Sequence, residues 1–361
     1  MSAPPERRRL ADTLVVAPNL HRRFSGVTAT VVALVPRQAV RGAVAATGFG
    51  LPALVPRFPL RELLTRGWSR PPGGAPARVW HARRNDEMIV GLLLRDLLRQ
   101  KWRLVFTSAA QRRHTRFTRA LLARMDALVA TSPMAAAYLD APHEIVGHGV
   151  DTALFRPAVD KAAAMAALGF PGMIGIGAFG RVRHNKGVDL FVDAALALLP
   201  ARPDVVAVVG GAIAPEHKAF ADALKARIAA AGLADRVAFL GEIDGAKLRA
   251  WYAAMTVHCA PARWEGFGLT PLEAMASGTA TVATRVGAAS LLVDDGTTGL
   301  LVPPDDGAAL TAALARLLDD RALAADMGRA GRRRAVARFD LEGEVDALAA
   351  IYARILARRN D

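Results

Sequence analysis

Two glutamates stand close together in a stretch whose residue types could bind a ligand. Glu265 and Glu273 flank a glycine-rich turn and a Thr-Pro step in residues 263–278, RWEGFGLTPLEAMASG. Thr270 as N-cap, followed by Pro271, predicts that a helix begins here, because the fixed φ of proline suits the first helical position. A carboxylate at the mouth of a helix accepts hydrogen bonds from hydroxyl groups. The stretch therefore indicates a ligand that carries hydroxyls.

Glu273 has a second interpretation. Its spacing from Thr270 fits a capping box, in which the glutamate reaches back to the N-cap amide and stabilises the helix start by roughly 1 kcal/mol. That structural role would leave Glu265, Gly266 and Gly268 unexplained. The two glycines could let a ligand approach the backbone, and the free amides of a helix N-terminus attract an anion. A ligand with both hydroxyl and phosphate groups accounts for all of these residues.

A second group of residues could bind phosphate. Arg181 and Lys186 lie in FGRVRHNKG, just before a helix that we expect to begin near Gly187. Two cations and a helix N-terminus suit a diphosphate, although a basic pair in such a loop is often only solvated. Together with the glutamates, the pair predicts a nucleotide-sugar site. The chain contains no Asp-x-Asp, so we predict neither a metal ion nor another cofactor.

Short apolar strands alternate with helical patterns along the chain. This alternation predicts an α/β fold with doubly wound parallel sheets. In the first half we expect a helix at 25–36 and strands at 13–20, 77–83, 103–108, 126–132 and 144–151. In the second half we expect helices at 187–199 and 215–231 and strands at 172–180, 204–211, 236–242, 256–262 and 279–287. Two such sheets would face a cleft lined by strand carboxyl ends, with a linker near 152–170.

Length and composition set the class of protein. A chain of 361 residues exceeds the usual size of one core, so two domains are expected. The single cysteine, Cys259, excludes an internal disulfide. No uncharged apolar run reaches 18 residues, and the beginning of the chain lacks the pattern of a signal peptide. We therefore expect a cytoplasmic protein.

The positive charge lies in the first half of the chain. Residues 1–170 contain 25 Lys and Arg against 11 Asp and Glu, whereas residues 171–361 contain 22 of each. This asymmetry favours an anionic partner, such as a membrane surface, a phosphorylated glycolipid or nucleic acid, over a merely solvated surface. The candidate contact is a cation cluster in which the first, third and fourth members would share a helix face: Arg112, Arg113, Arg116 and Arg119.

Several of these motifs resemble a known family. EGFGLTPLEAMASG resembles the E-x7-E motif of the retaining glycosyltransferases of family 4, and GRVRHNKG resembles their R-x4-K loop. The resemblance extends over most of the chain, including GHGVDTALFRP and DDGTTGLLVPP. It implies the GT-B fold, with two Rossmann-like domains that face a cleft. The implied domains are 1–165, on the acceptor side, and 166–339, which binds the nucleotide-sugar, with a C-terminal helix at about 340–361 packing back on the first.

The resemblance also implies roles for individual residues. Arg181 and Lys186 would hold the donor diphosphate and, with Glu265 facing the donor sugar, form the catalytic group. Glu273 would bind the ribose hydroxyls. Backbone amides near the sugar and phosphates would come from Gly266, Phe267, Gly268 and Leu269, and Gly26 would let the first domain approach the diphosphate. The family resemblance implies retention of configuration. The sequence alone shows no nucleophile.

The first half resembles a narrower group, the bacterial lipopolysaccharide core mannosyltransferases, which use GDP-mannose. The stretches that carry this likeness are APNLHRRFSGVTATVVALVP, VWHARRNDEM and FTSAAQRRHTRFT. One departure is that Phe106 precedes Thr107, where many relatives have a histidine that contacts the donor sugar. His81 or His114 would have to make that contact instead. Arg112 is a further candidate for the acceptor or sugar, and His148 stands where relatives often have asparagine.

These observations predict an enzyme that transfers a hexose from a nucleotide-sugar, GDP-mannose by the narrower resemblance, to a glycolipid acceptor. We expect its basic half to contact the anionic inner face of the cytoplasmic membrane and to bind no specific nucleic acid. A UDP- or ADP-sugar donor, a different acceptor, or a non-catalytic scaffold that binds nucleotide-sugars or polyanions remain alternatives. Paired acids speak against a pure polyanion binder.

Overall fold

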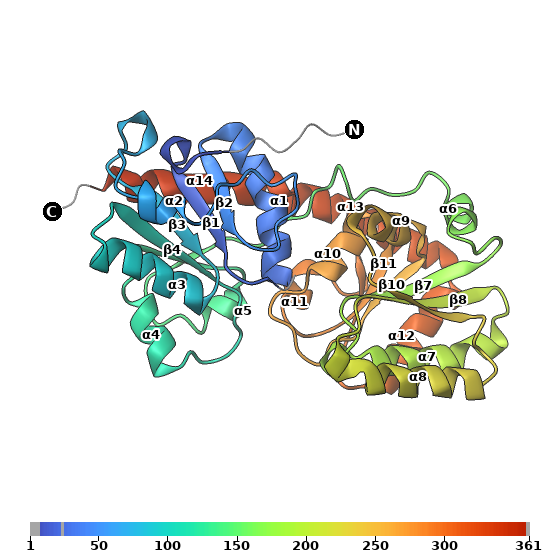
Figure 1. Ribbon diagram of the computed structural model, residues 1–361. Coiled ribbons are helices and arrows are strands. Elements are labelled where there is room, and N and C mark those ends of the chain that lie inside the picture. Colours follow the sequence, from blue (N-terminus) through green and yellow to red (C-terminus); the bar gives the residue numbers. More distant parts are fainter. Residues whose placement is uncertain (1–7, 23–24, 359–361) are drawn as a thin grey trace. The chain divides into compact units, whose positions relative to one another are not determined.

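Strands and helices alternate along the chain and build two sheets (Figure 1). The computed structural model describes residues 8–22 and 25–358. By its contacts the chain divides into two compact units, Met1–Gly149 with Leu341–Asp361 and Val150–Asp340. Each unit contains one parallel sheet of six strands. The prediction of an α/β fold with two doubly wound parallel sheets is confirmed.

The sheet of the first unit has the order β2-β1-β3-β4-β5-β6. Its strands are β1 (Val15–Asn19), β2 (Val44–Gly48), β3 (Arg78–Ala82), β4 (Trp102–Ser108), β5 (Ala127–Ala130) and β6 (Glu144–Ile145). The helices of this unit are α1 (Gly26–Arg41), α2 (Glu62–Thr65), α3 (Asn85–Leu92), α4 (Arg116–Leu122), α5 (Pro133–Ala136) and α14 (Leu341–Ala357).

Helices cover both faces of this sheet, which is why its strands are almost wholly apolar. Successive residues of β1 point to opposite faces: Val15 joins one core and Val16 the other. The first core holds α1 and α14, and the second holds α3 and α4. The buried face of α14 repeats at helical spacing through Leu341, Val345, Leu348, Ile351 and Ile355. The last turns of the chain therefore complete the core of the first unit.

The sheet of the second unit has the order β12-β11-β10-β7-β8-β9. Its strands are β7 (Ile174–Phe179), β8 (Val205–Gly210), β9 (Val237–Gly241), β10 (Val257–Ala260), β11 (Ala280–Thr284) and β12 (Gly299–Val302). The helices are α6 (Lys161–Ala167), α7 (Val188–Leu198), α8 (Lys218–Ala230), α9 (Gly245–Ala254), α10 (Leu269–Ala276), α11 (Ala289–Leu292), α12 (Gly307–Asp319) and α13 (Arg321–Arg338).

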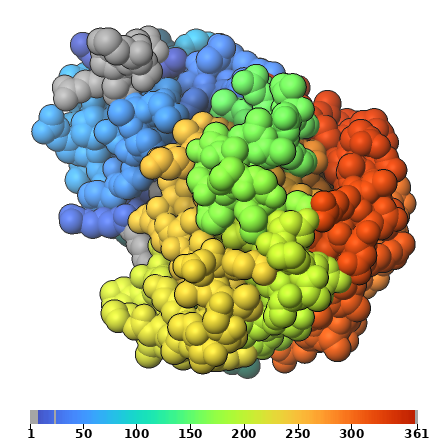
Figure 2. Space-filling view, turned by 90° about the vertical axis from the view of Figure 1, so that its right-hand side faces the viewer, coloured from blue at the N-terminus to red at the C-terminus, as the bar shows by residue number. Residues whose placement is uncertain are grey.

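Two layers of helices enclose this second sheet. One core contains residues of α7, α8 and α12, and the other contains residues of α6, α9 and α10. Figure 2 shows α6 in green against the gold of α9 at the surface. Because β7 lies between β8 and β10, the chain fills one side of the sheet and then crosses to the other. The carboxyl ends of β7 and β10 thus form the switch point at which such sheets bind ligands.

The structure also differs from the expected elements. Two strands, β2 and β12, were not predicted, and α1 continues past Pro36 to Arg41. The segment 152–170, expected as a linker, contains α6, which packs on α9 and places residues 150–165 in the second unit. The helix expected at about 340–361 is α14, which runs from Leu341 to Ala357; the expected range also includes residues 359–361, which lie outside the described residues. No helix in the described part of the chain is long and apolar enough to cross a membrane.

Candidate functional site

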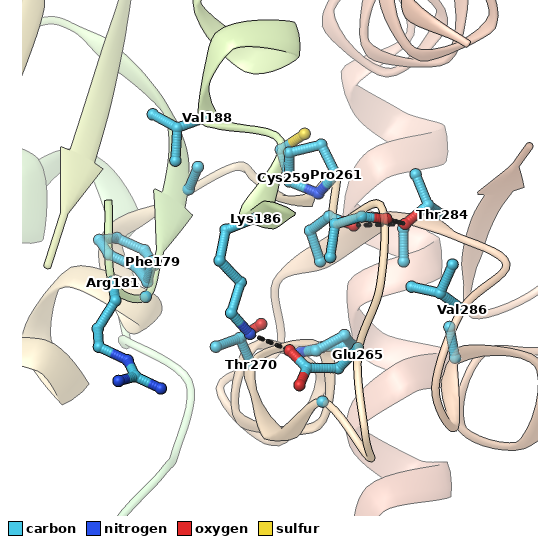
Figure 3. A pocket seen from close by; sticks show the side chains of 18 of the residues that line it. Phe179, Arg181, Lys186, Val188, Cys259, Pro261, Glu265, Thr270, Thr284 and Val286 are labelled. Carbon is cyan, nitrogen blue, oxygen red and sulfur yellow. Dashed lines mark hydrogen bonds and ion pairs between the residues drawn. The ribbon is translucent and has the colours of Figure 1, made fainter. Parts of the chain in front are cut away.

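A pocket lies at the switch point of the second unit, beside the N-termini of α7 and α10 (Figure 3). The ends of β7, β10 and β11 form its floor, and small side chains there leave room for a ligand. Three predicted charged residues and two predicted turn residues line it: Arg181, Lys186, Glu265, Phe267 and Gly268. The fold therefore brings together two segments that lie about 80 residues apart in the sequence.

An ion pair occupies the middle of this pocket. The ammonium group of Lys186 donates to Oε2 of Glu265, and the other carboxylate oxygen accepts from the amide of Gly266 at 3.0 Å. The two charged side chains are 22% and 24% exposed, so both remain accessible to a ligand. The cation predicted for phosphate and the acid predicted for the sugar thus form an ion pair with each other.

Arg181 follows directly after the end of β7. Its side chain also lines the pocket, but in Figure 3 it points away from the Lys186–Glu265 pair. The preceding Gly180 has φ of 134°, and its amide donates to the carbonyl of Gly210 at 2.8 Å. The end of β7 is therefore held against the end of β8. This support directs the loop that carries both predicted cations toward the helix N-terminus.

A partly buried arginine joins the two loops of the pocket. Arg263 donates from both terminal nitrogens to the carboxylate of Asp189 at 2.8 and 2.7 Å and from Nε to Asp305 at 2.6 Å. It also donates to the carbonyl of His184 at 2.7 Å, and its own amide donates to the carbonyl of Asn185 at 3.0 Å. The guanidinium lowers the pKa of Asp189 against the effect of burial. This arginine fixes the distance between the loops that carry the ion pair.

Gly187 allows the backbone of one loop to touch the other. Its φ is 67°, and a Cβ atom there would lie 1.9 Å from the carbonyl oxygen of Pro261. Only glycine fits this close approach in the left-handed conformation. The expectation that α7 begins near this residue is confirmed, since Gly187 is its N-cap.

Helix α10 begins earlier than predicted. Gly268 is its N-cap with φ of 89°, and Leu269 is the first helical residue. The interpretation of Thr270 as N-cap and Pro271 as the first helical residue is wrong. The reason is the turn before the helix, where the amide of Ala288 donates to the carbonyl of Phe267 at 2.8 Å and fixes the glycine in the left-handed region.

The earlier start also removes the capping box. Glu273 lies a full turn inside α10, and its Oε2 accepts a hydrogen bond from the hydroxyl of Tyr252 at 2.8 Å. Burial raises the pKa of Glu273, and this hydrogen bond opposes the rise. Burial, helped by the neighbouring carboxylate, raises the pKa of Tyr252 well above its ordinary value. The capping-box interpretation of Glu273 is therefore wrong, and Glu273 is not among the residues that line the pocket.

Tyr252 packs in an aromatic cluster with Phe179 and His258. The rings of Tyr252 and Phe179 pack edge to face, with 4.8 Å between their centroids. The ring of Phe179 stacks on that of His258, with 5.8 Å between the centroids. His258 is fully buried, donates from Nδ1 to the carbonyl of Gly177 at 3.1 Å, and has a pKa lowered by burial to about 3. A neutral histidine in this place packs as an aromatic ring. The cluster links the pocket floor at Phe179 to the carboxylate on α10.

The remaining predicted residues lie in the first unit. Gly26 begins α1 after the N-cap Ser25, and no atom lies within 4 Å of where its Cβ would be. His81 is buried, with Nδ1 at 2.6 Å from the hydroxyl of Tyr352 and Nε2 at 2.7 Å from that of Thr107. Burial lowers the pKa of His81 well below its ordinary value, with a smaller effect of a nearby arginine. Both ring nitrogens of this histidine are therefore engaged within the protein.

The prediction that Arg112, Arg116 and Arg119 share one helix face is wrong for Arg112. Helix α4 begins at Arg116 because Thr115 caps it by accepting from the amide of Thr118 at 3.1 Å. Arg112 thus lies in the preceding loop and cannot share a helix face with Arg116. His114, in the same loop, has its Nε2 buried without a partner among the described residues, and burial and Arg112 lower its pKa.

His148 packs against the C-terminal helix. Its Nδ1 lies 2.9 Å from Oε1 of Glu344, whose second carboxylate oxygen accepts from the amide of Gly149 at 2.8 Å.

Within the described residues, no group of three or more His, Cys, Asp or Glu is arranged to hold a metal ion.

Sequence reasoning missed three residues that support the site: Arg263, Asp189 and Tyr252. The first two lie 74 positions apart and the third lies 21 residues before its glutamate, so no local pattern joins them. Two clues were available in the sequence: Asp189 in the first turn of α7, and Arg263 next to the E-x7-E motif. Because they carry opposite charges and lie near the two predicted loops, they could be expected to pair.

Comparison with known proteins agrees with this architecture. Residues 174–320 match the family described as Glycosyl transferases group 1. The chain is 51% identical to the lipopolysaccharide core biosynthesis mannosyltransferase LpcC of Rhizobium leguminosarum bv. viciae, over 96% of this chain and 98% of LpcC. It is 50% identical to the corresponding enzyme LpsB of Rhizobium meliloti, over 96% of this chain and 99% of LpsB.

The same fold is found in a solved structure. HepE of Anabaena, crystallised with UDP and glucose, superposes with a TM-score of 0.81 at 18% identity and covers 94% of this chain and 99% of its own. The two parallel sheets, together with the full-length similarity to LpcC and LpsB, identify the chain as a glycosyltransferase of the GT-B fold and therefore as an enzyme. The chain belongs to the group 1 glycosyl transferases, in the family that includes LpcC and LpsB.

Proposed function

We propose that this enzyme transfers mannose from GDP-mannose to a lipopolysaccharide core or related glycolipid acceptor, with retention of configuration at the sugar. The observation that carries the proposal is the pocket beside a helix N-terminus that Lys186, Arg181 and Glu265 all line. The choice of mannose and of the acceptor rests on the full-length similarity to LpcC and LpsB, which are lipopolysaccharide core mannosyltransferases.

Each charged residue of the pocket has a part in this proposal. Arg181 and Lys186 bind the diphosphate, and the N-termini of α7 and α10 add their dipoles. Glu265 leaves Lys186 when the donor arrives and accepts hydrogen bonds from the hydroxyls of the sugar. Glu273, held by Tyr252, accepts hydrogen bonds from the ribose. The amides of Phe267 to Leu269 face the sugar and phosphates, and Gly26 provides room on the side of the first unit.

The reaction then depends chiefly on charged groups that are already in place to stabilise the leaving diphosphate. The acceptor hydroxyl attacks the anomeric carbon on the face that the diphosphate leaves, and an oxygen of the departing diphosphate takes the proton of that hydroxyl. The cations and helix dipoles stabilise the negative charge that develops on the leaving group. These residues provide the required charge, so the proposal includes no metal ion or other cofactor.

The acceptor side belongs to the first unit in this proposal. A glycolipid acceptor would lie in the cytoplasmic membrane, and we place the enzyme in the cytoplasm at the inner face of that membrane. The charge of the first unit supports this location, with 26 Lys and Arg against 13 Asp and Glu, because anionic lipids attract such a surface. Arg112 and His114 remain candidates for contact with acceptor or sugar.

Donor choice is tested by thermal unfolding and turnover with GDP-mannose, UDP-glucose and ADP-glucose. A ligand that binds only the folded state raises its stability by mass action, so GDP-mannose should raise the melting temperature most and be consumed with a lipopolysaccharide core acceptor. The anomeric coupling of the product, measured by NMR, reports retention. Turnover of a UDP- or ADP-sugar in place of GDP-mannose, or an inverted product, would contradict the corresponding part of the proposal.

A further inference from the structure

Three arginines in β3 and the loop after it differ in how well the fold satisfies them. Arg78 is 1% exposed, and its guanidinium donates five hydrogen bonds, to four backbone carbonyls and a serine hydroxyl. Arg84 donates four, to one carboxylate and three uncharged side chains. Arg83 is 9% exposed, yet within the described residues its guanidinium donates only one, from Nη1 to the carbonyl of His81 at 3.2 Å. The third arginine is therefore buried without its full set of partners.

Arg83 lies at the switch point of the first sheet. It directly follows β3 and precedes α3 (Figure 1). The chain passes from β1 to β2 on one side of the sheet and from β3 to β4 on the other, so the carboxyl ends of β1 and β3 are the place where such a sheet binds ligands. In the described part of the chain, Nε and Nη2 of Arg83 have no hydrogen-bond partner, and neither nitrogen is fully enclosed. Both can donate to a ligand.

The buried acid beside Arg83 is already used. One oxygen of Glu87 accepts from Nη1 of Arg84 at 2.7 Å, and the other accepts from the backbone amide of Arg83 at 2.7 Å. Burial raises the pKa of Glu87, and this amide and the guanidinium of Arg84 oppose the rise. Among the described residues, the guanidinium of Arg83 forms no ion pair. Two positive side chains thus share a single buried carboxylate.

The groups that face Arg83 from α14 do not supply the missing charge. The hydroxyl of Tyr352 lies 2.6 Å from Nδ1 of His81. Burial raises the pKa of Tyr352 to about 12, against the effect of Arg83, and burial together with Arg83 lowers the pKa of His81. Both side chains are therefore neutral near pH 7. Glu344, on the same helix, has its two oxygens engaged by His148 and by a backbone amide.

A buried charge destabilises the fold unless it is paired. We propose that Arg83 binds an anionic group, a carboxylate or a phosphate, on the sugar that accepts the transferred hexose, and that it thereby selects an acidic acceptor. The planar fork of a guanidinium matches two oxygens of either group. The inference rests on the proposed function in that the acceptor binds to the first unit.

The test measures, by calorimetry without donor, how the full-length protein binds a lipopolysaccharide core oligosaccharide. The oligosaccharide is used in its native form, with its carboxyl groups reduced to alcohols, and with its phosphates removed. Wild type should bind the native form about tenfold more tightly than one of the modified forms, which identifies the anion. Arg83→Met should bind the native form about tenfold more weakly than wild type and no better than that modified form. Arg83→Lys should keep part of the preference, because it keeps the charge.

The melting temperature separates a ligand contact from a structural role. Methionine fills the space of a buried arginine without its charge, so Arg83→Met should leave the melting temperature unchanged or raise it. Arg66→Met replaces an exposed arginine of the same unit and is the matched control, which should bind as wild type does. The affinity for GDP should be unchanged in both variants, because the described residues that line the donor pocket belong to the second unit.

Three outcomes would overturn this assignment. Equal binding of all three oligosaccharides by wild type, or binding of none, would show that no anion is selected. A preference for the native form that survives in Arg83→Met would assign the anion to another residue. A lower melting temperature of Arg83→Met, with an equal loss of affinity for all three forms, would make the arginine structural. Mannose transfer from GDP-mannose is followed in parallel, and the expected binding without transfer would contradict the proposed function while supporting the role of Arg83.

Discussion

Lys186 and Glu265 form an ion pair, but we assign them to the diphosphate and the sugar of the donor, so their substitutions should affect different ligands. We predict that Lys186→Ala and Arg181→Ala each weaken GDP binding by about 1.5–3 kcal/mol, because each removes charge-assisted hydrogen bonds to the diphosphate. Glu265→Gln should lower kcat for the sugar donor more than it lowers affinity for GDP, which has no sugar. Calorimetry with GDP and steady-state turnover measure both effects, and an equal loss of both in Glu265→Gln would contradict its assignment to the sugar.

The carboxylate of Glu273 gives a second prediction, on donor binding. Tyr252→Phe removes the hydroxyl that donates to Glu273 at 2.8 Å, so the ribose contact should loosen. We expect a higher KM for the donor with little change in kcat, since the hydroxyl is remote from the reacting bond. Glu273→Gln should raise KM further. A fall in kcat with unchanged KM in Tyr252→Phe would show that the hydroxyl does not act through ribose binding.

The same carboxylate predicts a pH dependence of stability. Burial raises the folded-state pKa of Glu273 above its ordinary value of 4.5, so the unfolded chain releases this proton at lower pH than the folded chain. The free energy of unfolding should therefore fall as pH rises from about 4.5 through the folded-state pKa. Glu273→Gln should remove this decrease and leave the protein at least as stable at neutral pH. Parallel unfolding curves for both proteins across this window would argue against a raised pKa.

At the scale of elements, the contact between the two pocket loops depends on one glycine. Gly187→Ala should place a Cβ atom against the carbonyl oxygen of Pro261, 1.9 Å away in the present backbone, and force the loop that carries Lys186 to move. We expect a lower melting temperature and weaker GDP binding. Gly307→Ala, at the start of α12, is the matched control, because its φ is ordinary and its Cβ would lie 3.6 Å from Leu190. An equal effect of both variants would exclude the loop contact as the cause.

The sequence predicted most strands and both charged motifs, because buried parallel strands and helix starts have local patterns. It missed β2 and β12: the first is short and rich in alanine, and the second, GLLV, follows a turn with few strand formers before it. The sequence also placed the start of α10 too late. The preference of Thr for the N-cap and of Pro for the first helical position is a local rule, and it does not include the hydrogen bond between Phe267 and Ala288, which lies 21 residues further along the chain. What was missed depends on contacts between distant segments.

At the scale of the whole molecule, every described residue that lines the candidate donor pocket belongs to one unit. We predict that a fragment of residues 150–340 folds alone and binds GDP, because its ends are joined by the pairing of Val150 with Asp340. It should not transfer sugar, since it lacks the first unit. Circular dichroism, GDP calorimetry and turnover would test this. A folded fragment that fails to bind GDP would show that the first unit supplies essential donor contacts.

The position of α14 has a consequence for how the chain is made. The first unit is built from residues 1–149 and from the last segment after residue 341, whereas residues of the second unit are continuous. A ribosome therefore delivers the whole second unit before the helix that buries Val31, Leu34 and Val35 of α1 exists. Because domains fold as units during synthesis, the domain that is begun first is finished last. Until residues 341–357 have left the ribosome, the apolar face of α1 has no partner from α14.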